Sequence, residues 1–202
     1  MWEKEKFFKL YLKKKLFFAR TILIYFFLTN SSFADLKLEL IKKLEKVDTL
    51  SFSFEQHVSG KVETGNCKIQ YPKLIRCDYN DAYEKRLISN GKTLAIIQRR
   101  YKKIFYYNFK LTPLNFILDK KYLLEFIKKK DYKNINKSLI EYEIQIDNKK
   151  KIKILFDKNS LNLRGWKTVD IYGNQVEFLV SHLKLNLPLD KKIFKIPLES
   201  NL

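Results

Sequence analysis

Two cysteines are the side chains whose type and spacing indicate a defined chemistry. Cys67 and Cys77 are the two cysteines of the chain, and apolar residues alternate with polar ones on both sides of Pro72. This alternation predicts two strands that turn at Pro72, with Cys67 opposite Cys77 on the inner face. A cross-strand disulfide fits this geometry. Two buried thiols are the alternative, and a zinc site is disfavoured because the spacing matches no common zinc finger.

Motifs for catalysis are missing from the sequence. It contains no Gly-x-Ser-x-Gly, no phosphate-binding glycine-rich loop and no His-Glu-x-x-His. His57 and His182 lie at strand positions that favour surface or structural roles. Glu141 and Glu143 alternate onto the outward face of a strand, which favours solvated carboxylates. We therefore predict a protein that is not an enzyme and that uses no metal and no cofactor.

The chain is strongly basic. Its 202 residues include 41 Lys and Arg against 22 Asp and Glu, a formal net charge of +19. Such a charge admits anionic partners, among them nucleic acids and acidic lipids. No signature of a nucleic-acid-binding module accompanies it, so we expect no nucleic acid partner. Hydrophobic residues make up 46% of the chain, which suits one compact domain and excludes global disorder.

The first 34 residues have the order of a secretion signal. Basic residues up to Arg20 precede an apolar run over 22–28, and a small-x-small pattern ends at Ala34. This order predicts a cleavable signal peptide over 1–34 and a mature domain over 35–202. A membrane anchor is the alternative, but the apolar run is about half of the roughly 20 residues that span a bilayer.

Hydrophobic periodicity predicts a mainly β domain with small helices. A helical spacing of apolar residues covers 36–47, and Pro113 favours a short helix that is followed by another over 121–128. Alternation elsewhere predicts about ten antiparallel strands, with a tight turn at Asn90-Gly91. The clearest strands are expected over 50–58, 85–89, 93–98, 103–108, 140–146, 152–156, 161–170 and 175–185. This order of elements indicates a strongly curved sheet or an incomplete antiparallel β-barrel.

Short motifs are spread over most of the predicted domain. They are Phe54-Glu-Gln56, Gly65 through Pro72 to Tyr79, Ser89-Asn-Gly-Lys-Thr-Leu94, Thr112-Pro113-Leu114, Trp166-Lys-Thr-Val-Asp170 with Gly173, and Ile193-Phe-Lys-Ile-Pro197. In this order the set resembles the LolA family of periplasmic outer-membrane lipoprotein carriers. The resemblance implies an incomplete β-barrel whose apolar concavity is closed by an α-helical lid. The helix at 35–47 and the insert beginning at Pro113 would form that lid.

The resemblance also implies a function and a set of partners. A carrier of this kind sequesters the acyl chains of lipoproteins in its apolar cavity and shuttles them through the periplasm. The cargo would arrive from an inner-membrane ABC lipoprotein exporter and leave toward an acceptor at the outer membrane, or toward that membrane itself. We expect these acylated partners, a periplasmic location and a monomer.

The apolar face of each predicted strand and helix selects residues for the acyl cavity and its lid. They are Phe52, Phe54, Ile69, Tyr71, Ile75, Leu114 and Ile117. The alternative is that these side chains form an ordinary core. The family commonly has Arg directly before the hairpin proline, where it takes part in lid closure and release, whereas this sequence has Tyr71. Tyr71 either gives its hydroxyl to backbone groups of the lid or packs as a plain aromatic side chain.

Two functions of other kinds stay open as alternatives to the carrier. One is a lipid- or lipoprotein-sensing envelope module on the same fold. The other is a secreted hydrolase or sugar-binding protein that uses the basic face. Binding of a fatty-acid probe that an acylated peptide displaces favours the carrier, whereas glycan binding unaffected by lipid favours the last of these.

Overall fold

A computed structural model describes residues 31–148, 150–170 and 173–202. The predicted signal peptide lies outside the described residues as far as residue 30, and the expected cleavage point after Ala34 falls within helix α2, Ser31–Glu45. The chain divides into two compact units, Met1–Glu39 and Leu40–Leu202. The second unit holds the whole β-sheet.

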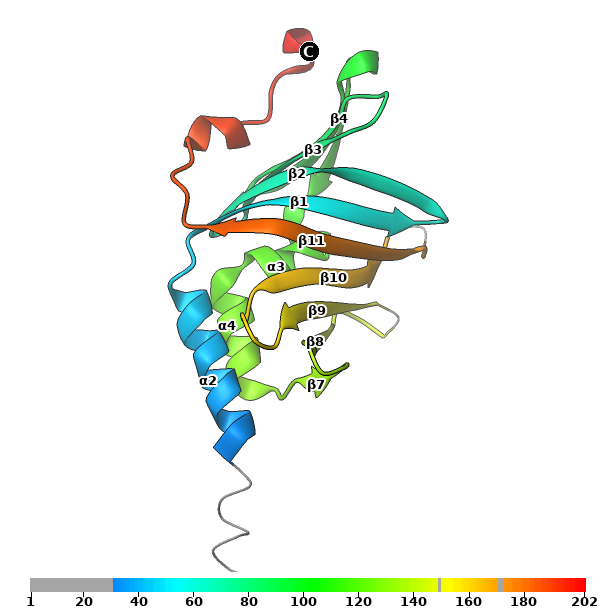
Figure 1. The fold of residues 1–202 in the computed structure, drawn as a ribbon. Helices are drawn as coiled ribbons and strands as arrows, with labels where there is room; N and C mark the ends of the chain where they lie inside the picture. The colour runs from blue at the N-terminus through cyan, green and yellow to red at the C-terminus, as the bar shows by residue number, and fades with distance from the viewer. Residues whose placement is uncertain (1–30, 149, 171–172) are drawn as a thin grey trace, which may run out of the picture. The chain divides into compact units, whose positions relative to one another are not determined.

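The sheet of the second unit is antiparallel, curved and open. Its eleven strands follow the order β6-β5-β4-β3-β2-β1-β11-β10-β9-β8-β7, so β1 and β11 pair in the middle and β6 and β7 form the edges (Figure 1). The strands are β1 Thr49–Val58, β2 Lys61–Gln70, β3 Leu74–Tyr79, β4 Lys85–Asn90, β5 Thr93–Gln98, β6 Lys103–Asn108, β7 Lys133–Asn134, β8 Leu139–Gln145, β9 Lys151–Asp157, β10 Leu163–Val169 and β11 Gln175–Leu185. The mainly β class and the strongly curved open sheet predicted from the sequence are confirmed.

The cysteine hairpin has the register that its alternation predicts. Strands β2 and β3 pair with Cys67 opposite Cys77 and Ile69 opposite Ile75. The preceding turn between β1 and β2 was not predicted. Ser59 and Gly60 both take positive φ there, which is typical of the tight turns that join antiparallel strands.

Two short helices follow β6. Helix α3 spans Leu114–Leu118 directly after Pro113, and helix α4 spans Lys120–Lys129. The carboxylate of Asp119 accepts a hydrogen bond from the backbone N–H of Tyr122 and so caps the first turn of α4. The helix predicted over 36–47 ends two residues earlier, at Glu45. Short 3-10 helices cover Arg99–Tyr101, Phe109–Leu111, Lys191–Phe194 and Glu199–Asn201.

The hydrophobic core lies on the face of the sheet that carries the cysteines, called the inner face below. Ile117 of α3 and Leu123 of α4 approach Leu50 and Phe156 of this face around one small hollow. A second cluster lies on the outer face of β4–β6 and consists of Ile88, Ala95, Ile97 and Ile104. Ile196 and Leu202 pack against this second cluster, so the C-terminal segment covers it.

None of the described helices is long and apolar enough to cross a membrane. The same residues contain no group of three or more His, Cys, Asp or Glu side chains that could hold a metal ion.

Candidate functional site

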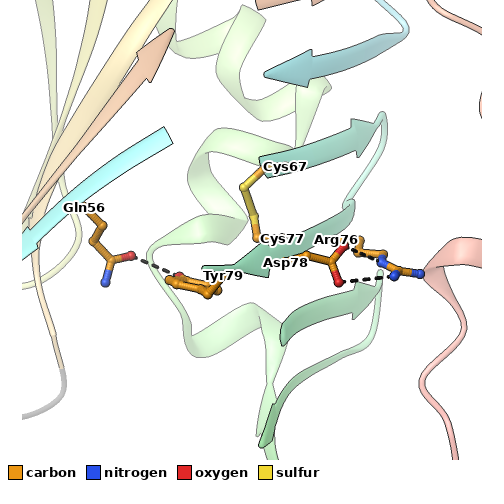
Figure 2. The surroundings of a disulfide bond; sticks show 6 residues. All are labelled: Gln56, Cys67, Arg76, Cys77, Asp78 and Tyr79. Atoms are coloured by element: carbon orange, nitrogen blue, oxygen red, sulfur yellow. Dashed lines mark hydrogen bonds and ion pairs between the residues drawn. A yellow bond between two sulfur atoms is a disulfide. The ribbon is translucent and has the colours of Figure 1, made fainter. Parts of the chain in front are cut away.

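A disulfide bond joins the two strands of the cysteine hairpin. Cys67 and Cys77 are bonded across β2 and β3, with 4.1 Å between their Cα atoms (Figure 2). The two residues are 1% and 2% exposed, so the bond is shielded from solvent. Of the alternatives left open by the sequence, the structure has the disulfide and not the pair of thiols.

An open hollow of about 360 Å³ lies on the inner face of the sheet. Its apolar lining comes from Ile75, Cys77, Leu87, Leu94, Ile96, Tyr107, Leu111, Pro113, Leu114, Ile146, Trp166, Val169, Val176 and Phe178. Polar side chains enter the lining from Gln56, Tyr79, Thr112, Lys150, Thr168 and Asp170. A volume of this size falls within the range of about 300–1,000 Å³ that is typical of small-molecule pockets. The predominance of apolar groups suits a hydrocarbon ligand.

A row of aromatic rings from neighbouring strands forms the floor of this hollow. Trp166 stacks on Phe178 with 4.0 Å between the ring centroids, and Phe54 stacks on the same phenylalanine at 4.7 Å. Tyr79 meets Phe54 edge to face at 4.8 Å. Gly65 lies opposite Phe54 in the register, and a Cβ at this position would come within 2.7 Å of the Phe54 ring. The glycine therefore leaves the room that this ring needs.

A second hollow lies beneath the two short helices and is much smaller, about 20 Å³. Its lining includes Val47, Leu50 and Tyr71 together with Ile117 and Leu123. A space of this size holds about one water molecule. The region under α3 and α4 is therefore packed, whereas the region beside the aromatic floor is open.

The residues predicted to line the cavity divide among three places. Ile75 and Leu114 line the large hollow, and Tyr71 and Ile117 line the small one. Phe52, Phe54 and Ile69 are buried within the inner face. The analysis of the sequence missed the contributions of β4, β5, β10 and β11. Alternation could have found them, because every second residue of a strand lies on the same face. The residues on the inner face that also line the hollow are Leu87, Leu94, Ile96, Trp166, Val176 and Phe178.

Tyr71 packs as an aromatic side chain. Its hydroxyl makes no hydrogen bond to the described residues, and burial raises the pKa of this hydroxyl. The Nζ of Lys120 lies 5.9 Å from the centroid of the Tyr71 ring and donates to the backbone carbonyls of Glu45 and Val47. Contact with the carbonyls at the end of α2 is thus made by Lys120 of α4 and not by Tyr71.

Lys73 forms a second tie between the sheet and the helices. Its Nζ lies 2.8 Å from Oδ2 of Asp119, and its backbone N–H donates to the carbonyl of Leu118 at 2.9 Å. Partial burial alone would raise the pKa of the Asp119 carboxyl. The hydrogen bond and charge of Lys73 and the backbone N–H of Tyr122 outweigh it and hold that pKa below its usual value.

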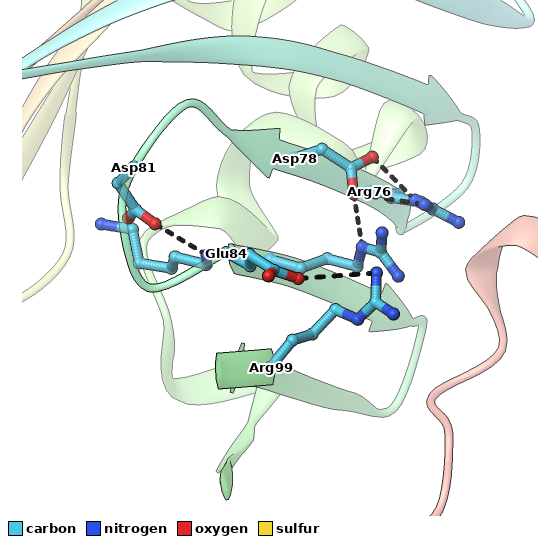
Figure 3. A network of polar contacts seen from close by, with 7 residues as sticks. Arg76, Asp78, Asp81, Glu84 and Arg99 are labelled. Atoms are coloured by element: carbon cyan, nitrogen blue, oxygen red, sulfur yellow. Dashed lines mark hydrogen bonds and ion pairs between the residues drawn. The ribbon is translucent and has the colours of Figure 1, made fainter. Parts of the chain in front are cut away.

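Polar contacts also gather on the outer face, away from the hollow. Asp78 accepts hydrogen bonds from Arg86 and, with Nε at 2.9 Å, from Arg76. Figure 3 shows the contact between Arg76 and Asp78. Arg99 lies 3.9 Å from the Glu84 carboxylate in the same region. Burial would raise the pKa of Asp78, but its two arginine partners lower it. These residues form polar contacts on the outer side of β3 and β4 and do not line the hollow.

Glu141 of β8 is buried and forms an ion pair. Glu141 was expected in solvent, but it is only 4% exposed, and it pairs with Lys133 of β7 and Leu155 of β9. The expectation of a solvated face is therefore wrong for this residue. Its Oε1 lies 3.1 Å from Nζ of Lys153, and a hydrogen bond from this lysine to Glu141 raises the lysine pKa.

Curated relatives support the resemblance found in the sequence. The outer-membrane lipoprotein carrier protein of Pasteurella multocida (strain Pm70) is 38% identical over 80 residues, which cover 37% of this chain and 39% of that protein. The protein of the same name from Haemophilus influenzae (strain PittEE) is 44% identical over 73 residues, which cover 33% and 36%. The matched stretch thus spans less than half of the length of these relatives.

Solved structures with a similar arrangement of elements include a LolA superfamily protein from Nitrosomonas europaea. It has a TM-score of 0.41 and 10% identity, and the match covers 79% of this chain and 97% of that one. The description of the matching family is "Outer membrane lipoprotein carrier protein LolA", and its match runs over residues 45–197. The chain therefore belongs to the LolA family of outer-membrane lipoprotein carrier proteins.

Proposed function

We propose that this protein binds the acyl chains of lipoproteins in the large hollow and carries them through the periplasm from the inner to the outer membrane. The observation that carries the proposal is the hollow of about 360 Å³ with an apolar lining and an aromatic floor. Membership of the carrier family supports it.

The physical need for such a carrier follows from the cost of exposing acyl chains to water. A lipoprotein with about three acyl chains exposes CH₂ groups that cost about 0.8 kcal/mol each, which gives more than about 30 kcal/mol in total. Free diffusion of the cargo between membranes is excluded by a cost of this size. Apolar burial is non-directional, so one hollow suits chains of differing length.

The cargo is larger than the hollow. A volume of about 360 Å³ lies near the lower end of the range of about 300–1,000 Å³ for one drug-sized ligand, so three acyl chains need more room than it offers. Helices α3 and α4 cover the packed region beside the hollow, and we propose that they act as the lid whose displacement admits the rest of the cargo.

The proposed partners are an inner-membrane ABC lipoprotein exporter as donor and an acceptor at the outer membrane, or that membrane itself. The carrier acts as a monomer. Apolar contact with the acyl chains gives the affinity, and a more apolar acceptor draws the chains out of the hollow.

Binding of a fluorescent fatty acid by the purified protein, and its displacement by an acylated peptide, tests this proposal. Ile96→Trp fills part of the hollow and should weaken probe binding by at least about tenfold. Tyr106→Trp is the control, because Tyr106 is 55% exposed and does not line the hollow. Absence of probe binding, or equal weakening by both substitutions, would contradict the proposed function.

A further inference from the structure

Four polar side chains form a connected network on the inner face of β1–β4. The hydroxyl of Tyr79 donates to Oε1 of Gln56 at 3.1 Å (Figure 2), and Nε2 of Gln56 donates to Oε2 of Glu63 at 3.1 Å. Lys85 forms an ion pair with Glu63, and its Nζ lies 4.0 Å from the centroid of the Tyr79 ring. One neutral amide and one hydroxyl are thus held in place by a balanced pair of charges.

Only part of this network reaches the large hollow. Gln56 and Tyr79 line it, whereas Glu63 and Lys85 do not. The lining also includes the apolar side chains of Val176 and Phe178 from β11, and Lys150 and Asp170 are the charged side chains that the described residues contribute to it. A few fixed polar groups in an otherwise apolar pocket are the usual means by which a ligand is oriented.

Gln56 retains one unused hydrogen-bond donor. Its Nε2 carries two N–H groups, of which one is directed to Glu63, and the described residues provide no partner for the other. Turning the amide over would place its oxygen against the Glu63 carboxylate and lose that bond, so the two partners favour the observed orientation. The second N–H thus belongs to an amide of favoured orientation on a residue that lines the hollow.

The charges around Gln56 favour a neutral acceptor. The positive charge of Lys85 is balanced by Glu63, and the carboxylate of Glu63 would repel a second anion close to the amide. Burial, with the charges of Glu63 and Asp81, raises the pKa of Tyr79, so its hydroxyl stays protonated and keeps its bond to Gln56. A carbonyl oxygen fits this site better than the carboxylate of a free fatty acid.

We propose that Gln56 donates a hydrogen bond to the carbonyl oxygen that links an acyl chain to its glycerol or peptide carrier, as an ester or an amide. The chain then extends along the apolar part of the hollow, and Tyr79 and Glu63 act as positioning residues for the amide. This inference rests on the proposed function, because it places the polar end of the ligand in the same hollow.

A matched pair of ligands isolates the carbonyl group. Monopalmitoylglycerol and hexadecyl glyceryl ether differ at the linkage, and only the ester has a carbonyl. N-palmitoylethanolamine provides the amide linkage, so the comparison also identifies which source of the carbonyl is preferred. We expect the unchanged protein to bind the ester or the amide about tenfold more tightly than the ether, which is the effect of one net hydrogen bond.

Gln56→Leu should abolish this preference, so that the ester and the amide bind no more tightly than the ether in the variant. Gln175→Leu is the control, because Gln175 is exposed and does not line the large hollow. Tyr79→Phe should also reduce the preference, because it frees the oxygen of the Gln56 amide, and it serves as the test variant if Gln56→Leu fails to fold.

The outcomes separate the inference from the proposed function. Equal affinity of the unchanged protein for all three ligands overturns the inference and leaves acyl binding intact. An equal loss of ester and ether affinity in the folded Gln56→Leu variant also overturns it. Binding of none of the three ligands overturns the proposed function and the inference together.

Discussion

The Nζ of Lys120, the first residue of α4, lies 2.7 Å from the backbone carbonyl oxygen of Glu45, the last residue of α2. A second bond of 2.9 Å reaches the carbonyl of Val47. The last carbonyls of a helix have no hydrogen-bond partner within the helix. A cation at this place donates hydrogen bonds to them and is attracted by the negative end of the helix dipole. One side chain thereby ties the end of α2 to the proposed lid.

Replacing Lys120 by methionine should loosen this tie. The substitution keeps most of the aliphatic chain but removes both hydrogen bonds, and we expect a loss of about 1.5–3 kcal/mol in the free energy of unfolding. Hydrogen exchange of the backbone amides over 40–50 should become faster, and bound fatty-acid probe should be released sooner. Lys121→Met is the control, because Lys121 is exposed and its side chain has no bond to the described residues. Equal exchange in both variants would show that the tie has no effect.

Two substitutions of Tyr71 test whether its ring or its hydroxyl affects stability and probe release. Because the hydroxyl has no hydrogen-bond partner among the described residues, Tyr71→Phe should leave stability and probe release unchanged. Tyr71→Ala removes the ring between the small hollow and Lys120, and should change probe loading or release more than it changes the midpoint of thermal unfolding. Stopped-flow release of the probe and thermal denaturation measure the two effects. Lower stability with an unaltered release rate in the alanine variant would refute this role.

The sequence predicted the parts of the fold that depend on local alternation. Pro72 marks the turn of the cysteine hairpin, and alternation on both sides sets which residues share a face, so the pairing of Cys67 with Cys77 followed. The strands at 93–98, 103–108 and 175–185 agree with β5, β6 and β11 for the same reason. Parity identifies the face of each side chain without reference to the rest of the chain.

Parity does not predict how far a side chain lies from the elements that cover its face. Phe54 and Ile75 share the inner face, yet Ile75 lines the large hollow while Phe54 is buried and stacks on Phe178. Glu141 lies on the expected face of β8, but its neighbours exclude water from it. The contact of Lys120 with Glu45 joins residues distant in sequence, so no local pattern indicates it.

Acid should weaken the first turn of α4. The pKa of Asp119 is lower in the folded protein than in the unfolded chain, so its stabilising effect is complete above the unfolded value of about 3.9 and is lost as the pH falls through the lower folded value. The midpoint temperature of thermal unfolding should therefore fall as the pH is lowered from 5 to about 3. The Lys73 charge that faces Asp119 does not change over this range.

Asp119→Asn isolates this contribution, because asparagine still caps a helix but does not titrate. The variant should lose less stability on acidification than the unchanged protein. Asp190→Asn is the control, since Asp190 caps the 3-10 helix Lys191–Phe194 and forms no ion pair with the described residues. If the Asp119 and Asp190 variants respond identically to acid, the contribution of the Lys73–Asp119 pair is refuted.

The disulfide should stabilise the folded protein mainly through the unfolded chain. It closes a loop with a sequence separation of 10, for which loop entropy gives about 2–3 kcal/mol. The double variant Cys67→Ala/Cys77→Ala should lose at least this amount, because two buried side chains also become smaller. Denaturant unfolding of the oxidised protein, the reduced protein and the double variant separates the two effects, since the reduced protein keeps both sulfur atoms. A thiol assay on unfolded, unreduced protein is the direct check, and two reactive thiols per chain would contradict the bond between β2 and β3.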